Sequence, residues 1–230
     1  AEEVLEDTVR RHKALGGMII VMEPMTGEIL AMASAPDFDP NTPGYYNYET
    51  QKMRPLVDIY EPGSTFKLVT AAAVLETDIY DLDDMIVTNN GTITVGTQTI
   101  TDSEVFEALT VQDVIVHSSN VGTIKMAQKL GKTSLFEYTR KFGFGIKTGI
   151  ELPGEARGIL HKPVDWSVTT LPTMAIGYGV SVTGLQLVSA YCAVANDGLL
   201  MAPQIIKTLI HADGTVQDKS PTGVRKVISE

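Results

Sequence analysis

Residues 61–76 read EPGSTFKLVTAAAVLE, a proline–glycine turn followed at once by an apolar segment. Within it, Ser64 precedes Lys67 by three residues, a spacing that places both side chains on one face of a helical turn. A serine hydroxyl is a weak nucleophile until a base lies within hydrogen-bond reach, and a lysine amine at this spacing can be that base without any histidine. The pattern therefore predicts a serine nucleophile activated by a lysine.

The surroundings of Ser64 and Lys67 support this interpretation. Pro62-Gly63 is a turn signal, so Ser64 is expected at or just before a helix N-terminus. The helix over residues 66–75 is apolar on nearly every side and is predicted to be buried, which favours the neutral amine that a base requires. The alternative is structural. The S-x-x-K pattern occurs by chance roughly once in a chain of this length, and the pair can be a helix cap and a surface lysine.

A second polar cluster, Ser118-Ser119-Asn120, begins 54 residues after Ser64. The stretch before it, residues 110–116, is predicted to be a short helix with a threonine cap, and residues 121–130 a second helix. The cluster therefore lies in a tight turn between helices, which can direct the Ser118 hydroxyl and the Asn120 amide into a cleft. The alternative is that Ser118 or Ser119 only caps the second helix.

Together the two motifs resemble those of the penicillin-recognising serine transpeptidases. The likeness is strongest to the transpeptidase domain of class B penicillin-binding proteins of the division or sporulation type. It covers residues from about Gly17 to about Lys207. The segments that resemble the family are residues 16–34, 37–41, 60–67, 142–155 and 175–198.

The resemblance implies roles for the matching residues. Ser64 attacks the D-alanyl-D-alanine bond of a peptidoglycan stem peptide, and Lys67 takes its proton. Ser118 passes a proton toward the leaving amine, and Asn120 holds the substrate amide. The implied protein is a D,D-transpeptidase of cell-wall synthesis and a target of β-lactam antibiotics. A membrane anchor is expected upstream of Ala1, with this domain on the extracytoplasmic side and other cell-wall synthesis proteins as partners.

One part of the family pattern is not found where it is expected. The third motif, Lys-Thr/Ser-Gly on a central strand, should lie well over a hundred residues after Ser118, beyond Glu230. Residues 147–149 read Lys-Thr-Gly but follow Ser118 by only 29 residues, among glycines and prolines typical of a loop. We therefore expect Lys147 to lie outside the active site, and the domain to be truncated before its third motif.

Composition excludes several other functions. The net charge of −10 argues against nucleic-acid binding, which requires a basic face. No run of about 18 apolar residues occurs, so no membrane-spanning helix is predicted. The single cysteine, Cys192, is expected in the core. No metal spacing occurs among His12, His117, His161 and His211, and no cofactor is expected.

The order of elements predicts an α+β protein. Residues 2–15 are expected to form an amphipathic helix with Val4, Leu5, Val9 and Leu15 inward, and residues 18–22 and 28–33 a hairpin. Short strands are expected at 85–88, 92–95 and 97–101, a helical stretch at 104–145, and a buried helix capped by Thr183 that ends at Ala195. The resemblance implies a β-lactamase/transpeptidase-like fold, with a helical lobe and a partial antiparallel sheet that lacks its C-terminal strands. The sheet-side lobe would comprise residues from about 1–60 and 200–230, and the helical lobe about 64–198.

Three other functions remain open. A class A serine β-lactamase needs a glutamate in a Glu-x-x-x-Asn loop, whereas Glu151 and Glu155 are followed four residues later by Glu155 and Ile159. A class D enzyme lacks the asparagine found at position 120. A β-lactam-sensing receptor domain would differ mainly in what precedes it, and a non-catalytic scaffold could keep the same fold.

Overall fold

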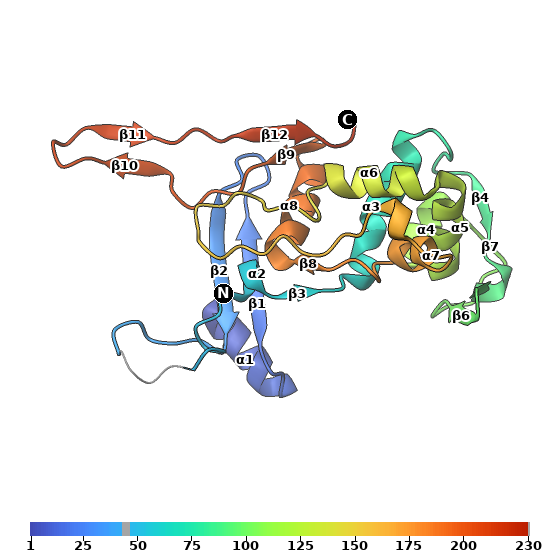
Figure 1. Cartoon of the computed structure of the whole chain (residues 1–230), viewed down its shortest axis with the longest axis horizontal. Coiled ribbons are helices and arrows are strands. Elements are labelled where there is room, and N and C mark those ends of the chain that lie inside the picture. Colours follow the sequence, from blue (N-terminus) through green and yellow to red (C-terminus); the bar gives the residue numbers. More distant parts are fainter. Residues whose placement is uncertain (43–46, 230) are drawn as a thin grey trace.

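The computed structural model describes residues 1–42 and 47–229, and it combines helices with short antiparallel strand pairs. In Figure 1 most helices gather on the right, and a hairpin with one helix at its lower end stands to the left. The α-helices are α1 (Glu2–His12), α2 (Arg54–Val57), α3 (Lys67–Glu76), α4 (Val111–Val116), α5 (Asn120–Leu130), α6 (Lys132–Lys141), α7 (Thr170–Ala175) and α8 (Gly184–Ala195). The 3₁₀ helices are η1 (Gly63–Phe66), η2 (Asn89–Gly91) and η3 (Pro163–Asp165).

The strands pair two by two, and every pair within the described residues is antiparallel. The pairs are β1 (Gly17–Met22) with β2 (Ile29–Ala35), β3 (Ile59–Tyr60) with β8 (Val182–Thr183), β4 (Met85–Val87) with β7 (Ala108–Thr110), β5 (Thr92–Val95) with β6 (Gln98–Thr101), β9 (Leu199–Met201) with β12 (Gly223–Lys226), and β10 (Thr208–Ile210) with β11 (Val216–Asp218). The protein combines helices with antiparallel strand pairs rather than with a parallel sheet, so the predicted α+β class is confirmed.

Helix α3 lies at the centre of the helical part, where it packs against α5 and α6. Phe66 just before it, and Val69, Ala73 and Val74 within it, are at most 1% exposed and belong to the largest hydrophobic cluster. The ring of Phe66 also meets that of Phe144, with 5.6 Å between their centroids. This packing fixes the start of α3, and with it the position of Lys67, on a rigid base.

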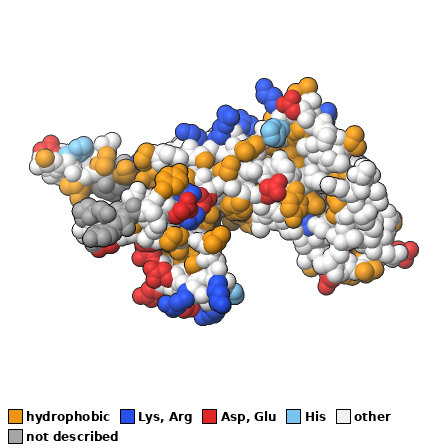
Figure 2. All heavy atoms as spheres, turned by 60° about the horizontal axis from the view of Figure 1, so that its bottom comes forward, with side chains coloured by type: hydrophobic (Ala, Val, Ile, Leu, Met, Phe, Trp, Pro, Cys, Tyr) orange, Lys and Arg blue, Asp and Glu red, His pale blue; other side chains and the backbone are white. Residues whose placement is uncertain are grey.

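The β1–β2 hairpin is covered by α1 on one side and by α8 on another. Leu5 of α1 packs with Ala33 and Ala35 of β2. The first turn of α1 is acidic and its last turn basic, which suits the helix dipole, and Figure 2 shows these charges on the helix that projects at the lower centre. On the other side Gly184 permits the close approach of α8, because a Cβ there would lie 2.5 Å from Met18 Sδ.

The predicted caps of two helices are confirmed. The Thr110 hydroxyl accepts from the Asp113 N–H at 3.0 Å, at the start of α4. Thr183 and Gln186 form a reciprocal capping box at the start of α8, which ends at Ala195 as predicted.

Three details of the sequence-based prediction are wrong. Helix α1 ends at His12, where Lys13 turns left-handed, so Leu15 lies beyond it and is fully exposed. Val4 is 64% exposed because it points away from the hairpin that Leu5 contacts. The stretch 104–145 is not all helical, since residues 108–110 form β7; a three-residue strand is too short to show alternation, and only its pairing with β4 stabilises it.

None of the helices within the described residues combines the length and the apolar character needed to cross a bilayer.

Candidate active site

The turn that carries Ser64 is held by a segment more than a hundred residues away. The Gly63 N–H donates to the carbonyl of Gly177 at 3.1 Å. The Gly179 N–H donates to Glu61 Oε1 at 2.6 Å. These two bonds tie both ends of the turn to residues 177–179, so the backbone around Ser64 is fixed from outside its own helix.

Position 177 accepts only glycine. Its φ is +86°, and a Cβ there would lie 2.1 Å from the carbonyl oxygen of Gly63. We expect Gly177→Ala to displace the Ser64 turn and to destabilise the fold by about 1–3 kcal/mol more than Gly179→Ala does. Gly179 is a matched control, because its φ of +77° imposes a similar backbone cost but no atom lies within 4 Å of its Cβ position. Urea unfolding of both variants measures the difference, and equal losses would contradict it.

Lys67 and Ser118 meet directly, although 51 residues separate them. The ammonium nitrogen of Lys67 donates to the Ser118 carbonyl at 2.5 Å and lies 3.0 Å from the Ser118 hydroxyl. Lys67 is the first residue of α3 and only 3% exposed. Two residues singled out from separate sequence motifs are therefore joined in one polar contact.

Burial changes the proton affinity of Lys67. Desolvation lowers the pKa of its amine from 10.5 to about 8, and the negative charge of Asp102 partly opposes this change. Burial penalises the charged form of a lysine, so about a tenth of the amine is neutral at pH 7, far more than for an ordinary lysine. A neutral amine with this pKa can act as a general base.

Ser64 lies in η1, three residues before Lys67, and its side chain is exposed. Within the described part of the chain its hydroxyl makes no hydrogen bond. The carbonyl of Ser64 accepts from the Lys67 N–H, so the two residues share one helical turn. A direct contact between the Ser64 hydroxyl and Lys67 or Ser118 thus stays a prediction, and apo geometry is often loose in such sites.

Some polar groups of residues 118–120 stabilise the local structure, and others face the candidate site. Ser119 is the cap of α5, accepting from Gly122 N at 2.9 Å, so the capping alternative holds for Ser119 and leaves Ser118 to face Lys67. Ser118 has a φ of +52°, a left-handed conformation that costs a non-glycine residue about 1–2 kcal/mol. Asn120 Nδ2 donates to Thr101 O at 2.8 Å, and the binding of a substrate by Asn120 stays a prediction. The left-handed backbone of Ser118 is strained, and strained backbone is typical of functional sites.

Asp102 is a residue near the site to which the sequence analysis gave no role. It follows β6 and accepts hydrogen bonds from the Ser119 hydroxyl at 2.6 Å and from the backbone N–H groups of Asn120 at 2.5 Å and Val121 at 3.0 Å. No local pattern relates an aspartate to a motif that begins 16 residues later. Only the packing of β6 beside α5 brings them together.

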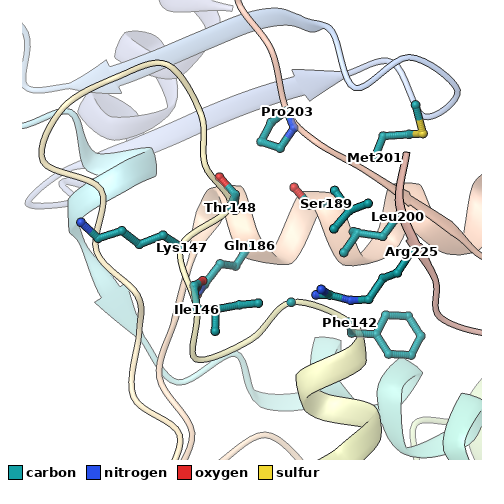
Figure 3. Close-up of a pocket in the computed structure, with 12 residues that line it drawn as sticks. Phe142, Ile146, Lys147, Thr148, Gln186, Ser189, Leu200, Met201, Pro203 and Arg225 are labelled. Carbon is teal, nitrogen blue, oxygen red and sulfur yellow. Dashed lines mark hydrogen bonds between the residues drawn. The ribbon is translucent and has the colours of Figure 1, made fainter. Parts of the chain in front are cut away.

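Residues 147–149 form no strand, as predicted. Their backbone is bound by the buried Glu155, whose carboxylate accepts from Thr148 N at 2.6 Å and Gly149 N at 3.1 Å. Lys147 borders a cavity of about 50 Å³ between α6, α8, β9 and β12, and Figure 3 shows its side chain directed away from the other labelled residues. Neither Ser64, Lys67 nor Ser118 lines that cavity.

One face of α3 is not covered, contrary to the expectation of a helix buried on all sides. Leu68, Ala72 and Leu75 are only partly buried and line an apolar groove of about 330 Å³ with residues of α4 and α8. The sequence gives the apolar character of the helix, but what packs against each side of it depends on the whole fold.

Comparison with known proteins gives one consistent result. Residues 17–230 match the family described as the penicillin-binding protein transpeptidase domain. The chain is 33% identical over 214 residues to the probable peptidoglycan D,D-transpeptidase PenA of Neisseria meningitidis. The aligned region covers 93% of this chain and 36% of the relative. It is 38% identical over 238 residues to stage V sporulation protein D of Bacillus subtilis. That aligned region covers 100% of this chain and 36% of the relative.

A solved structure agrees with these sequence matches. Penicillin-binding protein 3 of Mycobacterium tuberculosis, solved in complex with aztreonam, has a TM-score of 0.91 and 33% identity over 99% of this chain and 51% of that one. The match confirms the transpeptidase fold implied by the sequence. This chain spans about a third of the length of the curated relatives it matches.

Proposed function

We propose, since the chain belongs to the family of penicillin-binding protein transpeptidase domains, that it takes part in the cross-linking of peptidoglycan stem peptides through a Ser64 acyl-enzyme. The observation that carries this proposal is the contact of the buried Lys67 amine with Ser118, next to the helical turn that carries Ser64. β-Lactams would occupy the same site as substrate mimics.

Two proton transfers follow from the positions of these residues. In the first, neutral Lys67 accepts the hydroxyl proton of Ser64 as its oxygen attacks the D-alanyl-D-alanine carbonyl carbon. In the second, Lys67 returns a proton through the Ser118 hydroxyl, 3.0 Å away, to the leaving amine. The Ser64 N–H would bind the oxyanion, and Asn120 would orient the substrate amide. An acceptor amine then attacks the carbonyl of the Ser64 ester: the new amide bond forms, the ester C–O bond breaks, and the proton lost by the amine passes through Lys67 to the Ser64 oxygen.

The pH dependence of acylation is expected to report Lys67. Since only its neutral form is a base and its pKa is about 8, the acylation rate should rise with pH and reach half its maximum near pH 8. The Lys67 pKa is lower in the folded protein than in the unfolded chain, where it is that of an ordinary lysine. Between pH 8 and 10.5 the unfolded chain therefore binds more protons than the folded one. The contribution of Lys67 to the free energy of unfolding rises with pH over this range. Stopped-flow acylation rates between pH 6 and 10 measure the midpoint. A midpoint at the pH of an ordinary lysine would contradict the role of Lys67.

The proposed function is tested by incubation with a fluorescent penicillin, followed by mass spectrometry of the labelled peptide. We expect a single, stable adduct on Ser64, slowly formed in the 230-residue chain and faster in a version that continues past Glu230. Absence of label in both versions would contradict the proposal. Rapid hydrolysis of the drug without a stable adduct would instead identify a serine β-lactamase.

The setting of the domain is also proposed. Its stem-peptide substrate lies outside the cytoplasm, so we place the domain on the extracytoplasmic side, with a membrane anchor before Ala1 and other cell-wall synthesis proteins as partners. The relatives named as peptidoglycan transpeptidase and sporulation protein support this setting. We further propose a sheet-side lobe of about residues 1–60 and 200–230 and a helical lobe of about 64–198, with Ser64, Lys67, Ser118 and Asn120 converging where the lobes meet.

A further inference from the structure

The carboxylate of Asp102 accepts hydrogen bonds from three polar groups at the beginning of α5. Oδ2 accepts from the Ser119 hydroxyl at 2.6 Å, while Oδ1 accepts from both Asn120 N at 2.5 Å and Val121 N at 3.0 Å. Ser119 is only 2% exposed. Both carboxylate oxygens are thus committed to the backbone and side chain of the turn that contains Ser118.

These bonds determine what Ser118 can do. Because Ser119 donates to Asp102 and accepts from Gly122, it fills the cap position, and Ser118 is left in the left-handed conformation with φ +52°. In that conformation its carbonyl and its hydroxyl both face Lys67. A left-handed serine persists only where its surroundings hold it, and Asp102 holds the three residues that follow.

The charge of Asp102 acts on the same lysine. Of the described charged groups, only Asp102 raises the pKa of Lys67, in opposition to burial. Glu104 and His117 also lie near the turn and bind each other through Oε2 and Nδ1 at 2.8 Å, and Glu61 accepts from the Gly179 N–H. Asp102 therefore acts on the site through both geometry and electrostatics.

We propose that Asp102 is a positioning residue of this site, which fixes the turn that presents Ser118 and Asn120 and supplies the counter-charge to the Lys67 ammonium. The role in acyl transfer rests on the proposed function. A carboxylate at a helix N-terminus also stabilises the helix, so the test must separate this role from simple capping.

Two variants separate the geometric and electrostatic parts. Asp102→Asn keeps an oxygen for the N–H groups of Asn120 and Val121, but it removes the charge and the acceptor that faces the Ser119 hydroxyl. Ser119→Ala removes that hydroxyl and keeps the charge. Asp113→Asn is the matched control, since its carboxylate lies on α4 and accepts no hydrogen bond within the described residues. Thermal unfolding first confirms that each variant is folded.

Two measurements are made on these variants. The first is the pKa of Lys67, from the titration of its ¹³Cε resonance in the 230-residue chain, assigned with Lys67→Arg. The second is the rate of Ser64 acylation against pH in the longer version of the protein. We expect Asp102→Asn to lower the Lys67 pKa, to move the acidic limb of the rate profile to lower pH, and to reduce the plateau about 10- to 100-fold through misplacement of Ser118. Ser119→Ala should reduce the plateau without moving the limb, and Asp113→Asn should change neither.

An Asp102→Asn variant that loses thermal stability but keeps the wild-type Lys67 pKa and plateau rate overturns the proposal, because capping alone then describes Asp102. The proposal is also overturned if Asp113→Asn shifts the Lys67 pKa equally. The lysine titration requires no acylation. If wild-type protein is never labelled at Ser64, the proposed function fails, while the titration still decides whether Asp102 acts on Lys67.

Discussion

Replacing Ser64 with alanine is expected to abolish acylation by penicillin, in both the 230-residue chain and its longer version. The Ser64 hydroxyl lies on the same helical turn as the Lys67 base, and alanine leaves no oxygen to form the ester. Because Ser64 is exposed and makes no hydrogen bond within the described residues, the substitution should not change stability. Mass spectrometry of the intact protein after drug treatment measures the loss.

Lys67→Ala should nearly abolish the same reaction. General base catalysis typically contributes about 10²–10⁴ in rate, and among the described residues no histidine side chain hydrogen-bonds to Ser118 or Lys67; that of His117 binds Glu104. Ser220→Ala and Lys147→Ala are matched controls at exposed positions and should react at the wild-type rate. Label that survives Ser64→Ala, or that maps to Ser118 or Ser119, would identify a different nucleophile.

The second large effect is expected when the protein is extended past residue 230 by a third motif. We expect a longer version that includes a third Lys-Thr/Ser-Gly motif to react with penicillin about 10²–10³ faster than the 230-residue chain, because it would add a second donor to the oxyanion hole. In the family that motif also binds the substrate carboxylate, so affinity should rise as well.

Two uncovered surfaces near the nucleophile agree with this expectation. Within the described residues, the strands β1 and β2 pair only with each other, apart from a bridge between Glu28 and Gln204. Met18 and Ile20 of β1 line an open hollow together with Tyr60 and Thr65, one residue after Ser64. Here a further strand could pair beside the nucleophile, and we predict that the strand edge left unpaired is prone to self-association.

The comparison is made with second-order acylation rates of the two versions. Lys147→Ala in the 230-residue chain is the internal control, because its loop is bound by Glu155 and its side chain points away from the cavity it borders. Equal rates for both versions, or a strong loss on Lys147→Ala, would mean that the active site is completed within these 230 residues.

Much of the local structure could be predicted because its causes are local. The cap at Thr183 and the strand at residues 92–95 depend on nearby residues alone, and both are present. The strand at 108–110 could not be predicted, because its stability comes from pairing with residues 85–87. The exposure of Leu15 followed from the end of α1 at His12, which no strong signal in the sequence marks.

The sequence by itself determined which groups we propose as the reactive ones: a serine and a lysine on one helical turn, and a hydroxyl and an amide in a turn between helices. Those are consequences of spacing, which local backbone geometry converts directly into direction. Only the tertiary structure decided that Ser118, not Ser119, faces Lys67, that Asp102 holds their turn, and that burial lowers the pKa of the lysine to about 8. Hydrogen bonds and desolvation between residues far apart in the chain depend on packing, and no spacing in the sequence encodes them.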